Sequence, residues 1–123
     1  MQSNPFVDYV LNKFDRLKAQ FKAKNDQYAT ADPVANFRTG ALLRYRKCEP
    51  EDMYEVAKEY MGKHVAHVYN NGAHGPKVDE SLADIAIYCL IMLYFVKKAK
   101  KEPDDWAADA VKYFVGGYPH ADK

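Results

Sequence analysis

The feature that most constrains this chain is an unbroken apolar run from Ile85 to Val96, which follows an acidic start at Asp79-Glu80. A helix that is apolar on every side must be buried on every side, so the run predicts the central helix of a helical bundle. Cys89 lies inside the run and is expected to be a buried thiol. The run is too short to cross a bilayer, which takes about 20 apolar residues, so no membrane partner is expected.

Helix-start signals divide the rest of the chain. Asn4-Pro5 and Glu49-Pro50 each place a proline at the first position of a helix. Asp32-Pro33 gives the same signal, although a start near Asn36 fits the pattern equally well. No strand-like alternation of useful length is present. The sequence therefore predicts one all-α domain over residues 1–123, a four-helix bundle with a short fifth C-terminal helix. The predicted helices cover residues 5–24, 33 or 36 to 45, 50–69, 78–100 and 103–115.

The composition argues against nucleic acid as a partner and favours a second copy of the chain. Eighteen Lys and Arg nearly cancel 17 Asp and Glu, so no global field favours nucleic acid. The N-terminus lacks the basic and then apolar pattern of a signal peptide, and the two cysteines form no metal or redox spacing. A cytoplasmic location is expected. Ten Tyr, six Phe and one Trp are many for so short a chain, and predict burial across a subunit boundary in a homo-oligomer.

Two acids at the start of the central helix carry the main chemical signal. Glu80, Asp84 and Tyr88 recur every four residues and therefore share one helix face. Carboxylates one turn apart can hold one Mg²⁺ ion, which phosphate chemistry uses to neutralise developing charge. The alternative is that both acids only complement the positive end of the helix dipole.

The predicted third helix offers partners for these acids. Glu59 and Lys63 lie along one edge of its apolar face, with His64 near the centre and Glu55 further round. An antiparallel pairing with the central helix would bring Glu59 and Lys63 near its two acids. The alternatives are an ordinary solvated face with ion pairs between residues four apart, and a histidine that is simply half-buried.

A basic and aromatic segment from Asn36 to Lys47 can grip phosphates and stack a base. Its alternative is a helix with an aromatic core face and arginines that extend to solvent. Lys24-Asn25 and Tyr28 can likewise contact a nucleotide, or only close the first helix.

Taken together, several short motifs resemble one family. They are Lys24-Asn25-x-x-Tyr28, Asn36-Phe37, Lys63-His64 and Glu80-x-x-x-Asp84-x-x-x-Tyr88. Their order is similar to that in the all-α nucleoside triphosphate pyrophosphatases, the MazG-like and dimeric dUTPase superfamily, in particular its small phage-borne members. The resemblance spans residues 24 to 96, most of the chain.

The resemblance implies a hydrolase that splits a nucleoside triphosphate into a monophosphate and pyrophosphate. It implies a dimer or tetramer located in the cytoplasm, which for a phage protein is the cytoplasm of the host. It also implies a Mg²⁺ ion (or Mn²⁺) held by carboxylates of two adjacent helices. Glu59, Glu80 and Asp84 would be catalytic metal ligands, joined by Glu55. The nucleotide site implied in this way comprises Lys24, Asn25, Tyr28, Asn36, Arg38, Lys63 and Tyr88.

The chain also departs from the family pattern. Glu55 and Glu59 are four residues apart, where the family usually has a Glu-x-x-Glu pair. Gln27 and Gly62 occupy positions where the family often has an acid. Ile87 occupies a position where it often has asparagine. Each departure removes a possible ligand. The alternative function is therefore a non-catalytic phage accessory protein that binds a nucleotide or another protein on the same scaffold.

Overall fold

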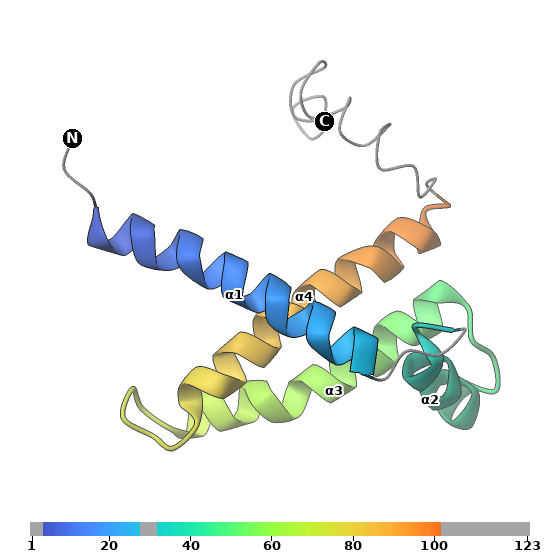
Figure 1. Cartoon of the computed structure of the whole chain (residues 1–123). Helices are drawn as coiled ribbons and strands as arrows, with labels where there is room; N and C mark the ends of the chain where they lie inside the picture. The colour runs from blue at the N-terminus through green and yellow to red at the C-terminus, as the bar shows by residue number, and fades with distance from the viewer. Residues whose placement is uncertain (1–3, 28–31, 102–123) are drawn as a thin grey trace, which may run out of the picture.

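The computed structural model describes residues 4–27 and 32–101. Within them the chain forms four helices and no strand: α1 (Pro5–Gln27), α2 (Ala35–Tyr45), α3 (Pro50–Asn70) and α4 (Val78–Ala99) (Figure 1). The predicted all-α fold is confirmed, while the fifth helix predicted over 103–115 lies outside the described residues. None of the four helices is long and apolar enough to span a membrane.

Local side-chain contacts explain where α1 and α3 begin. The Asn4 carboxamide oxygen accepts hydrogen bonds from the backbone amides of Phe6 and Val7, at 3.0 and 3.2 Å. These amides have no partner within the helix, so the side chain satisfies them. At the start of α3, the Glu49 amide donates to the Asp52 carboxylate at 3.0 Å. Both helix starts lie where the Asn-Pro and Glu-Pro pairs predict them.

The central unit is an antiparallel hairpin of α3 and α4 (Figure 1). Its register is fixed by His64, whose Nδ1 lies 3.6 Å from Asp84 Oδ2, and by Met61, whose sulfur lies 3.9 Å from that of Cys89. The short helix α2 packs against the N-terminal half of α3, and α1 crosses α4 obliquely. The antiparallel pairing predicted for the third and central helices is therefore present.

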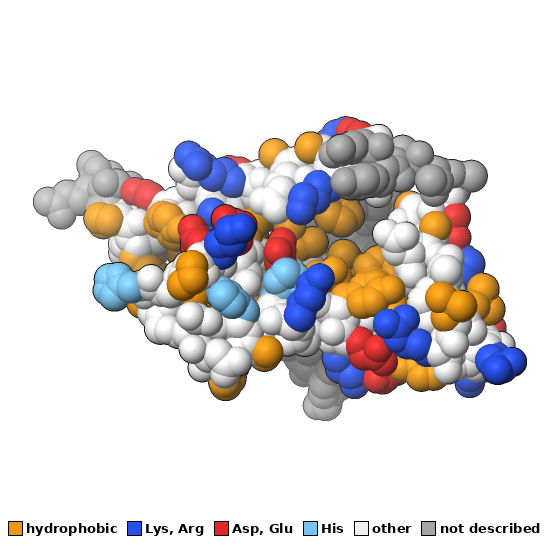
Figure 2. Space-filling view, turned by 90° about the horizontal axis from the view of Figure 1, so that it is seen from below, with side chains coloured by type: hydrophobic (Ala, Val, Ile, Leu, Met, Phe, Trp, Pro, Cys, Tyr) orange, Lys and Arg blue, Asp and Glu red, His pale blue; other side chains and the backbone are white. Residues whose placement is uncertain are grey.

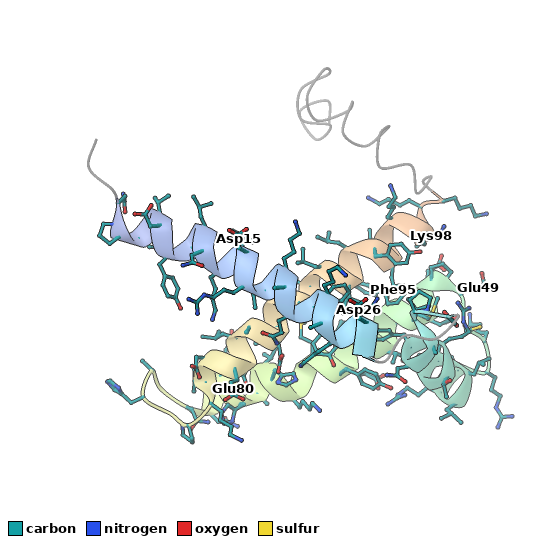
Figure 3. The ribbon with its side chains drawn as sticks, viewed as in Figure 1. Asp15, Asp26, Glu49, Glu80, Phe95 and Lys98 are labelled. Atoms are coloured by element: carbon teal, nitrogen blue, oxygen red, sulfur yellow. The ribbon has the colours of Figure 1, made fainter. Side chains whose placement is uncertain are left out.

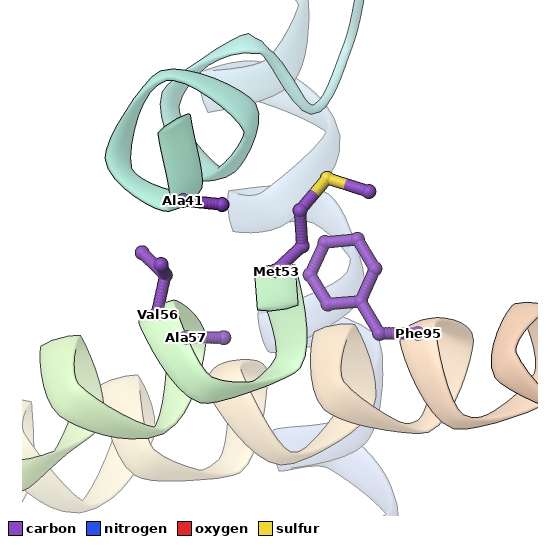
Figure 4. Packing of buried hydrophobic residues seen from close by; sticks show 5 residues of the cluster. All are labelled: Ala41, Met53, Val56, Ala57 and Phe95. Carbon is purple, nitrogen blue, oxygen red and sulfur yellow. The ribbon is translucent and has the colours of Figure 1, made fainter. Parts of the chain in front are cut away.

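The core lies where α2, α3 and α4 meet. Figure 4 shows Ala41, Met53, Val56, Ala57 and Phe95 packed together from these three helices. Phe95 and Val56 are the largest fully buried side chains among the described residues. The Phe95 ring meets the Phe37 ring of α2 edge-on, with centroids 5.4 Å apart.

One prediction about α4 is wrong. The helix is not buried on every side, because Leu90 and Leu93 are 60% and 62% exposed, and Leu82 is also exposed. Cys89 is exposed rather than buried. A helix packs only where it has neighbours, and in a single chain α3 and the crossing α1 cover only part of α4. The apolar composition indicated how much of the surface of α4 can be buried. It did not indicate how much of that surface the other helices of one chain cover.

Candidate functional site

A cleft of about 660 Å³ opens between α2, α3 and α4. Figure 2 shows hydrophobic side chains gathered in a hollow on this side of the molecule, with basic, acidic and histidine side chains around it. The lining combines aromatic, basic and amide groups, which is the mixture expected of a site for a charged aromatic ligand. The lining residues are Asn36, Phe37, Thr39, Gly40, Leu43, Arg44, Tyr60, Lys63 and Tyr88.

The shape of the cleft depends on Gly40. A Cβ atom at this position would lie 2.9 Å from both Tyr60 Oη and Val56 Cγ1, closer than side chains tolerate. The glycine therefore lets α2 approach α3 and lets the Tyr60 ring lie beside it. Phe37 and Tyr60 stand with ring centroids 5.8 Å apart, and together they form an aromatic wall.

Arg44 is the most firmly held cation of the cleft. Its Nε donates to Glu59 Oε1 at 2.7 Å, and its Nη1 donates to the Gly40 carbonyl at 3.2 Å. The guanidinium also lies over the Tyr60 ring, 5.5 Å from the centroid. Chiefly through the Glu59 hydrogen bond, the pKa of Arg44 is raised from its ordinary value. Arg44 is thus fixed in place and charged.

Lys63 is the second cation of the lining. It is exposed and forms no ion pair with any residue in 4–27 or 32–101. Because its ammonium group is not engaged by a carboxylate, it can accept an anionic ligand without first breaking a salt bridge. Asn36, at the opposite wall, adds an amide that both donates and accepts.

Next to the cleft, His64, Asp84 and Tyr88 form a polar cluster between α3 and α4. The His64 and Tyr88 ring centroids are 5.9 Å apart, and His64 also faces Asp84. Burial raises the pKa of the Tyr88 hydroxyl, and the charge of Asp84 raises it further. Tyr88 belongs both to this cluster and to the cleft lining, so it links Asp84 to the cleft.

The two acids predicted on α3 are already engaged. Glu59 accepts hydrogen bonds from Arg44 and from the Tyr45 hydroxyl, the latter at 2.9 Å, and this bond raises the pKa of Tyr45. Glu55 forms an ion pair with Lys58 at 3.0 Å. Neither contact is the i,i+4 pair of the alternative, because Glu59 is bonded to α2 and Glu55 pairs with a residue three positions away.

The four predicted carboxylates are spread along the α3–α4 hairpin. Asp84 faces His64, and at 1.5 Å per residue Glu80 lies about 6 Å from Asp84 towards the α3–α4 loop. Glu59 lies about 7.5 Å from His64 in the other direction along the hairpin. Figure 3 shows Glu80 at the loop end of α4. Within the described residues no group of three or more His, Cys, Asp and Glu is placed to hold a metal ion. The four-carboxylate site stays a prediction.

The predicted nucleotide residues divide into two groups. Asn36, Lys63 and Tyr88 come together in the cleft. Arg38 does not line it, because its Nε donates to Asp32 at 2.6 Å, and this bond raises the pKa of Arg38. The remaining three lie at the end of α1 or beyond it: Lys24 and Asn25 are exposed in its last turns, and Tyr28 is outside the described residues.

Sequence reasoning missed Tyr60 and Gly40 as parts of the site. The available signal was a glycine in the middle of a predicted helix, which can have a packing reason.

Comparison with known proteins adds no relative. No family model matches the chain, and neither the curated proteins nor the solved structures give a match. The resemblance to the all-α nucleoside triphosphate pyrophosphatases therefore stays a prediction, and the site is interpreted from its own residues.

Proposed function

We propose that the cleft between α2, α3 and α4 binds a nucleotide. The supporting observation is the convergence of two cations, Arg44 and Lys63, with the aromatic rings of Phe37, Tyr60 and Tyr88. Cations recognise phosphates, and aromatic faces stack on a base. The volume of about 660 Å³ lies within the range of roughly 300–1,000 Å³ that is usual for small-molecule sites.

Each cation would contribute in its own way. Arg44 presents a planar fork that suits bidentate contact with a phosphate, while Glu59 and the Tyr60 ring hold it in place. Lys63 supplies a mobile point charge. The Asn36 amide can pair with either donors or acceptors of a base or sugar. A nucleotide ligand agrees with the cytoplasmic location that the sequence predicts.

Hydrolysis of the bound nucleotide is the second candidate. It is favoured by Asp84, which lies beside His64 and Tyr88 next to the cleft, with Glu80 one turn away on the same helix. Mg²⁺ is often held by only one or two carboxylates and the phosphates of the substrate, so Glu80 and Asp84 fit such an ion. Bound there, Mg²⁺ or Mn²⁺ would neutralise phosphate charge and acidify a water molecule. Self-association of the chain is the remaining part of the proposal, and the exposed Leu90 and Leu93 of α4 support it.

The test of binding compares two lysines of α3. Thermal-shift measurements with a panel of nucleoside triphosphates are expected to show stabilisation that rises with ligand concentration. Lys63→Ala is expected to weaken binding by roughly 10-fold, because it removes a charged contact. Lys58→Ala is the matched control, since Lys58 is on the same helix but outside the cleft. Equal binding by both variants, or no response to any nucleotide, would contradict the proposal.

The test of hydrolysis is separate. The chain is incubated with the same nucleotides and Mg²⁺, and the products are separated by chromatography. Monophosphate and pyrophosphate from the parent chain, lost in Asp84→Asn, would support hydrolysis. Binding without any product, unchanged in Asp84→Asn, would leave a binding protein and exclude the enzyme.

A further inference from the structure

One carboxylate of α3 holds the last turn of α2. Glu59 accepts two hydrogen bonds, on Oε1 from Arg44 Nε at 2.7 Å and on Oε2 from the Tyr45 hydroxyl at 2.9 Å. Arg44 and Tyr45 are the last two residues of α2, so a single side chain of α3 engages both. We call Glu59 and Tyr45 the Arg44 clamp.

The contacts of Arg44 decide which of its donors are left for a ligand. A guanidinium has five N–H donors. Glu59 accepts from Nε, and the Gly40 carbonyl accepts from Nη1 at 3.2 Å. The Tyr60 ring lies against the group, with its centroid 5.5 Å from Arg44 Cζ. Neither hydrogen bond uses Nη2, so its two donors are left to bind a phosphate.

The Arg44 clamp matters because Arg44 lies at the surface. Its side chain is 38% exposed, and a long side chain in this position would otherwise sample several rotamers. Ordering such a side chain only when the ligand binds costs roughly 2- to 10-fold in affinity. Glu59 and Tyr45 order Arg44 beforehand, so this loss is avoided.

The same contacts argue against a divalent cation on Glu59. Both carboxylate oxygens are engaged with α2. A metal ion bound there would lie beside the Arg44 guanidinium, whose Nε is 2.7 Å from Oε1, and the two positive charges would repel each other. The ion would have to displace Arg44, which the cleft needs for the phosphate.

We propose that Glu59 and Tyr45 are positioning residues of the nucleotide site, which act on the ligand only through Arg44. This inference rests on the proposed binding of a nucleotide in the cleft. It gives Glu59 a role that needs no metal ion, whereas the resemblance to the pyrophosphatases implies a metal ligand. It also adds Tyr45, which does not line the cleft and matters only through Glu59.

The first test asks whether the effect of Glu59 needs a metal ion. Isothermal titration calorimetry measures the dissociation constant of the nucleoside triphosphate, among ATP, GTP, CTP, UTP and their deoxy forms, that stabilises the parent most. The titration is done once with EDTA and once with Mg²⁺. Glu59→Ala should weaken binding by about 5-fold in both, because Arg44 must then be ordered on binding. Glu51→Ala is the matched control, since it removes the same charge from an exposed position of the same helix and should leave binding unchanged.

The second test asks whether Glu59 acts through Arg44. Arg44→Ala should weaken binding by roughly 10-fold. Adding Glu59→Ala to it should cause no further loss, because no guanidinium is left to position. It should even tighten binding slightly, since a negative charge near the phosphate is removed. If Glu59 only held the fold together, its loss would weaken binding with and without Arg44.

Tyr45→Phe is the milder change to the Arg44 clamp. It removes one hydrogen bond to Glu59 and keeps the ring, so a loss of affinity of about 2-fold is expected, again only when Arg44 is present. Circular dichroism of each variant checks that the helices are kept. If Glu59→Ala loses its helices, Tyr45→Phe decides, and an affinity equal to that of the parent then overturns the proposal.

Three results would overturn the role of Glu59 while nucleotide binding stands. They are parent-like binding by Glu59→Ala, a loss seen only with Mg²⁺, and the same loss in the Arg44→Ala background. A parent chain that binds none of these nucleotides would overturn nucleotide binding in the cleft, and the Arg44 clamp with it. The two failures are therefore distinguishable.

Discussion

Two glycines of this chain have opposite roles, although both lie inside helices. Gly40→Ala would place a methyl group 2.9 Å from the buried Val56, and overpacking costs about 1–3 kcal/mol. That cost exceeds the gain of up to about 1 kcal/mol in helix propensity, so a net loss of stability is expected. Gly62 has open space around its Cβ position, and Gly62→Ala should stabilise the fold by about 1 kcal/mol. Urea unfolding measures both. Stabilisation by both substitutions would show that α2 does not depend on Gly40 for its approach to α3.

Asp32 makes the stability of the α2 start dependent on pH. Its hydrogen bond from Arg38 is the main reason that its pKa is lowered from the ordinary value of 3.8. Because the folded pKa lies below the unfolded one, the ionised carboxylate stabilises the fold at neutral pH, and this contribution is lost as the pH falls through the folded pKa. Asp32→Asn should therefore destabilise the chain near neutral pH, and the difference should shrink in acid. A difference in unfolding free energy that stays constant with pH would contradict this.

At the scale of helices, Phe95 joins α4 to α2 and α3. Its side chain is fully buried and its ring meets Phe37 edge-on. Phe95→Ala should lose about 3–5 kcal/mol of unfolding free energy, the usual cost of removing a buried aromatic ring. Leu90→Ala, at an exposed position of the same helix, should change it by less than about 0.5 kcal/mol. Equal losses in urea unfolding would mean that the two faces of α4 are buried alike.

Helix starts were predictable from the sequence, but the part of α4 that is buried was not. Asn4 and Glu49 act through contacts with the next few residues, so a local motif is enough to locate α1 and α3. The exposure of Leu90 and Cys89 depends on which helices lie beside α4 in space. The apolar run indicates how much of the surface of α4 can be buried. The other helices of a single chain cover only part of that surface.

At the scale of the whole molecule, the candidate site was predictable only in part. The predictable part follows from how two consecutive helices pair. Lys63 and Tyr88 share the cleft because the short loop forces α3 and α4 into an antiparallel hairpin, which the sequence indicated. The position of the Arg38 side chain was not predictable. It is set by the hydrogen bond that its guanidinium donates to Asp32, six residues earlier in the sequence. The part of Gly40 in the cleft was not predicted, because it depends on how closely α2 and α3 pack.

At the scale of the whole molecule, the core is small and large apolar faces remain exposed. Six hydrophobic residues are buried in the described part of the chain, and these come from α2, α3 and α4. The helix α1 is 23 residues long, yet it contributes none of them. Most helices in proteins depend on tertiary packing for their stability, so α1 has less of this support within the described part of the chain than α2, α3 and α4.

The central claim is that the cleft between α2, α3 and α4 binds a nucleotide. The most direct test is a crystal of the full chain soaked with a nucleoside triphosphate and Mn²⁺. Phosphate density is expected beside Arg44 and Lys63, with a base against Phe37 and Tyr60. An anomalous Mn²⁺ peak is expected beside Asp84 if the protein is also a hydrolase. Nucleotide density at another surface, with the cleft empty, would contradict nucleotide binding in the cleft.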